Sequence, residues 1–193
     1  MGHATMDRAR AAQLPEGDVI RILLEQHARI RELFDEIKKA GGVHKQHLWD
    51  ELRQLLAVHE TAEEMILRPI SRQAAGDVVV DARNREEAEA NEVLAELEKL
   101  EPGTPDFERS FALFEQSINE HAEKEEHEEF PQVIADCDET ERVDMGRMLR
   151  AAEAIAPTHP HPSTAGSTTA QWAAGPFASL VDRTKDAIKE AMR

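Results

Sequence analysis

Two segments of this chain, His59–Glu63 and His121–Glu125, carry a histidine followed four residues later by a glutamate. A proline follows each histidine after ten residues, at Pro69 and Pro131, so the whole pattern repeats at an offset of 62 residues. On a helix, positions i and i+4 lie on one face, so each segment directs an imidazole and a carboxylate to the same point. Two such faces inside a helical bundle can hold a metal pair. Mixed nitrogen and oxygen ligands suit iron, zinc or manganese better than a soft metal or calcium.

The composition favours helix throughout. Charged residues make up 32% of the 193 residues, aromatic residues only 4%, and tyrosine is absent. Alanine, leucine, glutamate and arginine dominate, and all four are good helix formers. We therefore expect an all-α protein.

Apolar residues recur at helical spacing in four long stretches and two shorter ones. The long helices are expected at about 18–40, 43–67, 78–100 and 106–129, with a shorter helix at about 139–156 outside the main set. Residues 1–15 are expected to form a loose lead-in and 16–156 the bundle with its extra helix. A linker rich in proline, histidine, serine and threonine spans 157–176, and an amphipathic helix spans 177–193. Docking of this last helix on the bundle is preferred over pairing with another subunit or loose attachment.

The formal net charge of −16 disfavours nucleic acid and anionic membranes as partners. Cys137 is the only cysteine, which excludes an intramolecular disulfide and a thiolate-rich metal site. No stretch has the length and apolar character of a membrane span, and Met1–Gln13 lacks the apolar core of a secretion signal. A cytoplasmic location is the resulting expectation.

The repeat also predicts which residues of the other two long helices face the metal. Aligning His27–Ile37 with Glu87–Leu97 matches their apolar positions and places Glu87 where the first half has His27. Glu86, Glu89 and Asn91 remain rivals of Glu87, because a slip in this alignment changes the answer. The predicted metal ligands are His27, His59, Glu63, Glu87, His121 and Glu125.

Other polar residues are given lesser roles. Glu60, Glu64 and Glu126 are candidate hydrogen-bond acceptors for the imidazoles of the site. His44 and His47 are expected at the surface, His127 is expected to face another direction than Glu125, and His159 and His161 fall in the linker.

The doubled His-x-x-x-Glu, its matched prolines and the upstream Glu25-Gln26-His27 resemble the hemerythrin family, specifically the bacterial hemerythrin-like HHE cation-binding proteins. The resemblance spans about residues 16–155. It implies an up-down-up-down four-helix bundle around a non-haem di-iron centre with an oxo or hydroxo bridge. Glu63 and Glu125 would bridge the two irons, and His27, His59 and His121 would be terminal ligands.

The sequence departs from this family at Glu87, where the family usually has a histidine. A carboxylate in place of a neutral imidazole adds negative charge, which favours the ferric state and resembles the redox-active ferritin-like centres. A half-occupied or mononuclear site is the alternative.

Two functions follow as hypotheses. The first is a di-iron protein that binds or reacts with O2 or H2O2 in oxidative-stress or iron handling, with catalase-like or peroxidase-like turnover left open. The second is an iron-sensing or oxygen-sensing module without turnover, in which metal occupancy orders the C-terminal helix. A metal-free structural bundle is a third reading. The sequence leaves the oligomeric state open.

Overall fold

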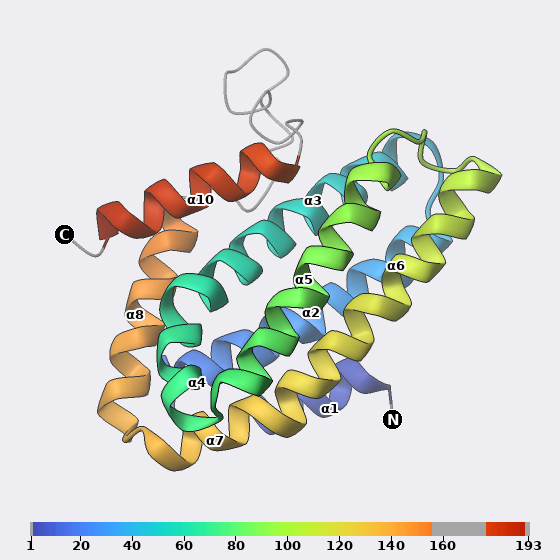
Figure 1. The fold of residues 1–193 in the computed structure, drawn as a ribbon. Coiled ribbons are helices and arrows are strands. Elements are labelled where there is room, and N and C mark those ends of the chain that lie inside the picture. The colour runs from blue at the N-terminus through green and yellow to red at the C-terminus, as the bar shows by residue number, and fades with distance from the viewer. Residues whose placement is uncertain (1, 156–176, 192–193) are drawn as a thin grey trace.

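A computed structural model of the protein describes residues 2–155 and 177–191, and the expected linker lies outside them. Four long helices form the bundle: α2 (Val19–Lys39), α3 (Gly42–Ala62), α5 (Asp77–Leu97) and α6 (Pro105–Lys124). Figure 1 shows them running alternately up and down, with α2 and α3 as one hairpin and α5 and α6 as the other. The described residues contain no strand, so the predicted all-α helical bundle is confirmed.

The second and fourth helices of the bundle continue past their His-x-x-x-Glu segments through a π-helical turn. These turns are η1 (Glu63–Leu67) and η2 (Glu125–Glu129), and each leads into a short helix, α4 (Arg68–Ala74) or α7 (Phe130–Asp136). Both turns and both short helices keep the offset of 62 residues that the sequence shows.

Pro69 and Pro131 explain why the π turns lie where they do. A proline inside a regular α-helix removes one backbone hydrogen bond and clashes with the preceding turn. In each half the residue before the proline bonds one residue further back than in an α-helix, with Arg68 N–H donating to the Glu63 carbonyl and Phe130 N–H to the Glu125 carbonyl. The prediction that the second helix ends near Leu67 and the fourth near Glu129 was therefore wrong.

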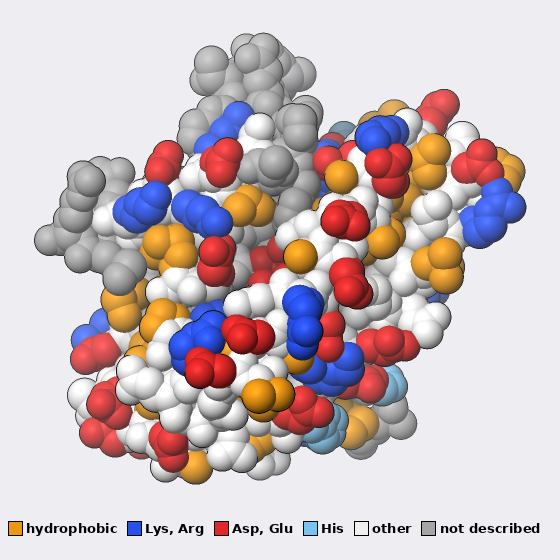
Figure 2. Space-filling view, viewed as in Figure 1, with side chains coloured by type: hydrophobic (Ala, Val, Ile, Leu, Met, Phe, Trp, Pro, Cys, Tyr) orange, Lys and Arg blue, Asp and Glu red, His pale blue; other side chains and the backbone are white. Residues whose placement is uncertain are grey.

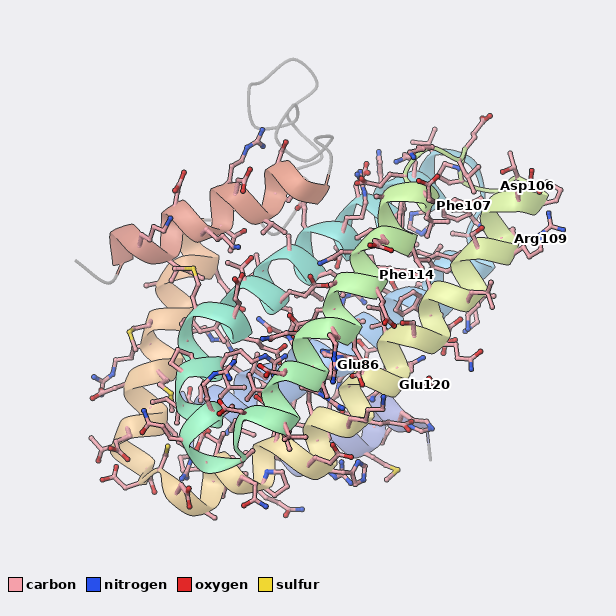
Figure 3. All side chains as sticks on the ribbon, viewed as in Figure 1. Glu86, Asp106, Phe107, Arg109, Phe114 and Glu120 are labelled. Atoms are coloured by element: carbon pink, nitrogen blue, oxygen red, sulfur yellow. The ribbon has the colours of Figure 1, made fainter. Side chains whose placement is uncertain are left out.

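The apolar core has two parts along the bundle axis. The larger part surrounds an aromatic cluster near the α2–α3 and α5–α6 connections, where Phe111 lies 5.2 Å from Phe34 and 5.8 Å from Trp49 between ring centroids. Figure 3 shows Phe107 and Phe114 in this half of α6, with Glu86 further along α5. The second part includes Leu23, Leu67 and Val133 at the other end of the bundle. The predicted metal ligands lie between the two parts.

In the part of the chain that the structure describes, three further helices cover the bundle: α1 (His3–Ala11), α8 (Glu139–Ile155) and α10 (Phe177–Ala191). The structure contradicts the expected loose lead-in, because α1 packs along α2 and its buried Asp7 pairs with Arg31. A stretch as short as α1 gives only a weak helix signal in the sequence. The ion pair between Asp7 and Arg31 joins residues far apart in the chain, so the sequence does not reveal it.

The C-terminal helix α10 docks on the bundle. It packs against α3 and α8, with Ile188 fully buried and Leu180 nearly so (Figure 1). Lys185 Nζ also lies 2.8 Å from Glu64 Oε2 on η1. Among the alternatives drawn from the sequence, docking is the one that the structure shows.

The acidic charge does not form one continuous patch on the face shown in Figure 2, where Asp and Glu side chains lie beside Lys and Arg. Among the described residues no helix is long and apolar enough to span a lipid bilayer.

Candidate metal centre

All six predicted ligands converge in the polar layer between the two parts of the core. They form two groups of four, in which the candidate ligand atoms lie within 4.8 Å of one another. The first group is His27, His59, Glu63 and Glu125; the second is Glu63, Glu87, His121 and Glu125. Glu63 and Glu125 belong to both groups, which is the arrangement that two carboxylates bridging a metal pair would need.

The first group lies between α2 and α3. The Nε2 atoms of His27 and His59 are 3.1 Å apart. Glu125 Oε2 lies 3.4 Å from His27 Nε2, and Glu63 Oε1 lies 3.5 Å from His59 Nε2. Both imidazoles and both carboxylates are buried, so water cannot replace a missing ligand easily.

The second group lies between α5 and α6. His121 Nε2 is 3.0 Å from Glu125 Oε1 and 3.7 Å from Glu87 Oε1. Glu87 is therefore the third-helix residue that the structure brings to the centre, as the repeat predicts. Of its rivals, Glu86 contacts the outer nitrogen of His121, Asn91 hydrogen-bonds Glu60, and Glu89 is exposed.

The donor atoms fit a cation. No described residue donates a hydrogen bond to either oxygen of Glu63 or to Glu125 Oε2, although these atoms are fully buried. Buried carboxylate oxygens without partners are costly, and a bound cation removes that cost. With two or more glutamates and an imidazole in each group, the donor set suits a hard or borderline metal such as iron.

The outer nitrogens of the imidazoles are held in the same way in both halves of the repeat. Gln26 Oε1 accepts a hydrogen bond from His59 Nδ1 at 2.8 Å, and Glu86 Oε2 accepts one from His121 Nδ1 at 3.2 Å. Figure 3 shows Glu86 on α5 beside α6. Such acceptors fix the ring so that Nε2 faces the metal.

Glu126 performs this role for His27. It accepts a hydrogen bond from His27 Nδ1 at 2.9 Å and also pairs with Arg10 on α1 and with Arg31 on α2. Of the three acceptors proposed from sequence, only Glu126 contacts an imidazole of the site. Glu64 is exposed and pairs with Lys185.

Arg68 is the residue at this centre that sequence reasoning missed. Its guanidinium is buried at the start of α4, with Nη2 within 2.8 Å of Glu125 Oε1, in short contact with Glu87 Oε1, and 3.6 Å from Glu63 Oε2. Its Nη1 pairs with Glu129, which is fully buried. The repeat contains the one signal for this residue. At the offset of 62, Arg68 stands where the other half has the apolar Phe130.

Burial and charge set the protonation of the centre. Burial lowers the pKa of His121, but Glu125, Glu86 and Glu87 together outweigh this effect and raise the pKa to about 10. Burial and the Glu125 charge raise the pKa of Glu63 well above its usual range, whereas burial and the charge of His27 lower the pKa of His59. Protons and Arg68 therefore neutralise part of the carboxylate charge.

A small cavity of about 20 Å³ lies beside the imidazoles of His27, His59 and His121. Its other walls are largely apolar, formed in part by Ile30, Leu56 and Ile118. This volume holds about one water-sized molecule. Glu60 also lines it, and burial raises the pKa of that carboxyl to about 8.

The remaining histidines of the described residues do not join the centre. His44 and His47 are exposed, as the sequence predicts, and His127 is exposed as well. His159 and His161 fall outside the described residues. Cys137 is partly buried at the end of α7 and contributes to neither group.

Comparison with known proteins agrees with this geometry. An uncharacterised hemerythrin-like protein of Schizosaccharomyces pombe is 21% identical over 172 residues, which cover 87% of this chain and 85% of that protein. No solved structure matches the chain. Residues 18–133 match the hemerythrin HHE cation binding domain. This match covers more than half of the chain and contains both ligand groups, so the protein belongs to the hemerythrin HHE cation-binding domain family.

Proposed function

We propose that the protein holds two iron ions and binds or reacts with O2 or H2O2, in oxidative-stress or iron handling in the cytoplasm. The observation that carries this proposal is the sharing of Glu63 and Glu125 by the two ligand groups. His27 and His59 would complete the site of one ion, and Glu87 and His121 that of the other. A pair of adjacent irons supplies redox chemistry toward oxygen or peroxide.

The protein's own residues define what such a centre accepts. The small cavity beside the three imidazoles admits a molecule close to water in size, which favours a diatomic ligand or peroxide over an organic substrate. The apolar walls limit the entry of water. The chain contains no tyrosine, so neither a tyrosinate ligand nor a tyrosyl radical takes part.

Anaerobic loading with Fe(II) tests this proposal directly. We expect iron to be retained through desalting, and the oxidised protein to absorb in the near ultraviolet as paired ferric ions do. Glu63→Ala should lose this iron, whereas Glu64→Ala, the exposed neighbour, should retain it. Failure of the unaltered protein to retain iron would overturn the proposal.

Turnover is tested by adding H2O2 to the iron-loaded protein and measuring O2. Release over many equivalents per centre supports catalase-like activity. A single spectral change without O2 release supports a binding or sensing role.

A sensing role without turnover is the second candidate, and the packing of α10 near η1 favours it. Ile188 of α10 belongs to the same buried cluster as Ile66 and Leu67 of η1, the turn that begins with Glu63. Metal at Glu63 would then stabilise the surface on which α10 docks. Hydrogen exchange of α10 should slow on iron loading if this reading is correct, and unchanged exchange would argue against it.

A further inference from the structure

The two ligand groups differ in how their carboxylate oxygens are used. In the first group, Glu63 Oε1 and Glu125 Oε2 accept no hydrogen bond from any described residue. In the second group, Glu87 Oε1 and Glu125 Oε1 are both paired with Arg68 Nη2. A cation entering the first group meets carboxylate oxygens without a hydrogen-bond partner, whereas one entering the second must displace a guanidinium from them.

The internal repeat shows that Arg68 and Glu87 differ from their counterparts together. The counterpart of Glu87 is His27, and the counterpart of Arg68 is Phe130. His27 and Phe130 stack, with ring centroids 5.6 Å apart and planes at 18°. At the equivalent place in the other half, Glu87 and Arg68 form an ion pair. One half of the centre thus has an aromatic contact where the other has a fixed positive charge.

Glu129 offers the displaced guanidinium another partner. Its Oε2 already pairs with Arg68 Nη1, while its Oε1 is fully buried and accepts no hydrogen bond from the described residues. Arginine and carboxylate groups often pair through two parallel hydrogen bonds. Arg68 can therefore give up Glu87 and Glu125 and still keep a buried anionic partner.

We propose that Arg68 is an internal counter-cation of the second ligand group, which makes the two metal ions bind in order and with unequal affinity. The first ion binds at His27, His59, Glu63 and Glu125. The second binds at Glu87 and His121 with the shared glutamates, and only when Arg68 withdraws toward Glu129. This inference rests on the proposed two-metal function and identifies the residue that sets its stoichiometry.

Calorimetric titration of the full-length, metal-free protein with Mn²⁺ tests the inference without reference to activity. We expect two binding steps, the second weaker than the first by roughly tenfold or more. Arg68→Leu should strengthen the second step by roughly tenfold, and by more than it strengthens the first, because Arg68 Nη2 pairs with both Glu87 and Glu125 of the second group. Arg72→Leu, at an exposed arginine of the same short helix, should change neither step.

Thermal unfolding of the same proteins provides an independent measurement. Metal-free Arg68→Leu should unfold at a lower temperature than the unaltered protein, because three buried glutamates and the partly buried Glu87 lose their shared partner. Mn²⁺ should stabilise this variant more than it stabilises the unaltered protein.

Glu129→Gln keeps the test open if Arg68→Leu does not fold. This change removes the anion toward which Arg68 withdraws, so the second step should weaken. Two equal binding steps in the unaltered protein would overturn the inference. So would a second step that becomes weaker in Arg68→Leu, or one that is unchanged or stronger in Glu129→Gln. Each of these results would leave the two-metal function intact. Binding of neither Mn²⁺ nor Fe(II) by the unaltered protein would instead overturn the proposed function itself.

Discussion

Gln26 Oε1 accepts a hydrogen bond from His59 Nδ1 at 2.8 Å, and this contact directs His59 Nε2 toward His27 and Glu63. We expect Gln26→Leu to weaken metal binding at the first ligand group by roughly 10- to 100-fold, because the ring loses the partner that orients it. Titration calorimetry measures the change. Gln46→Leu, at the start of the same hairpin's second helix, is the control. Equal affinity in the Gln26 variant would mean that packing alone orients His59.

Metal affinity should rise with pH. The pKa of His121 lies at about 10, since the surrounding glutamates together outweigh the effect of burial, and the pKa of Glu63 is also raised. Both groups must lose a proton to bind a metal, so a metal competes with protons below these pKa values. From pH 6 to 8 the apparent affinity should increase roughly tenfold per unit for each proton displaced. Titration in buffers of different ionisation enthalpy counts those protons, and a count of zero would contradict this prediction.

Glu87→His should destabilise the metal-free protein because it leaves Arg68 beside an imidazole instead of a carboxylate. Adding Arg68→Phe recreates the arrangement of His27 and Phe130 in the other half. The two substitutions should therefore be non-additive, with a coupling of about 0.5–3 kcal/mol in a double-mutant cycle measured by denaturant unfolding. Arg72→Phe combined with Glu87→His serves as the control and should show no coupling. Additive effects would mean that the two residues act independently.

Phe111→Ala should cost about 3–5 kcal/mol of stability. Phe111 is 1% exposed and contacts Phe34, Trp49 and Phe107 in the aromatic cluster. Metal retention by the folded variant should be unchanged, because the aromatic cluster lies in the half of α6 that precedes His121. Leu113→Ala, at a side chain that is 64% exposed, should change stability by less than about 0.5 kcal/mol. Loss of metal from folded Phe111→Ala would show that the cluster helps to position the site.

Gly146→Ala should destabilise the packing of α8 on α2 by about 1–3 kcal/mol. A Cβ at this position would lie 1.8 Å from the carbonyl oxygen of Gly17, a backbone atom that cannot move aside cheaply. Arg147→Ala, at an exposed neighbour on the same helix, tests whether substitutions on α8 matter in general. Equal melting temperatures for Gly146→Ala and the unaltered protein would show that α8 shifts to accommodate the methyl group.

The positions of the bundle helices and of the candidate ligands follow from local sequence patterns. Asp18 accepts a hydrogen bond from the backbone N–H of Ile20 at the start of α2, as expected of an N-cap. The apolar periodicity then carries His27 to the same side as His59. Glu87 was predicted because the repeat aligns each position of one hairpin with a position of the other, even where the two residues differ in type.

What sequence reasoning missed depends on contacts between distant residues. Arg68 is one of many charged residues in the sequence, and only the fold shows that Glu87, Glu125 and Glu129 surround it. Asp7 is buried because Arg31 reaches it from α2, which no local pattern reveals. Pro69 looked like a helix end because the usual rule assumes a regular α-helix on both sides.

Each π turn holds one residue more than an α-helical turn, and one residue corresponds to about 100° of helical rotation. The helical phase therefore changes within η1, between Ala62 and Arg68, although the axis continues. Before the turn, Leu52 and Leu56 face the aromatic end of the core; after it, Arg68 and Ser71 are the buried side chains. A one-residue deletion in either turn would restore a regular helix but rotate the following segment away from the centre. The spacing from Glu63 to Pro69 and from Glu125 to Pro131 is therefore a geometric requirement of the fold.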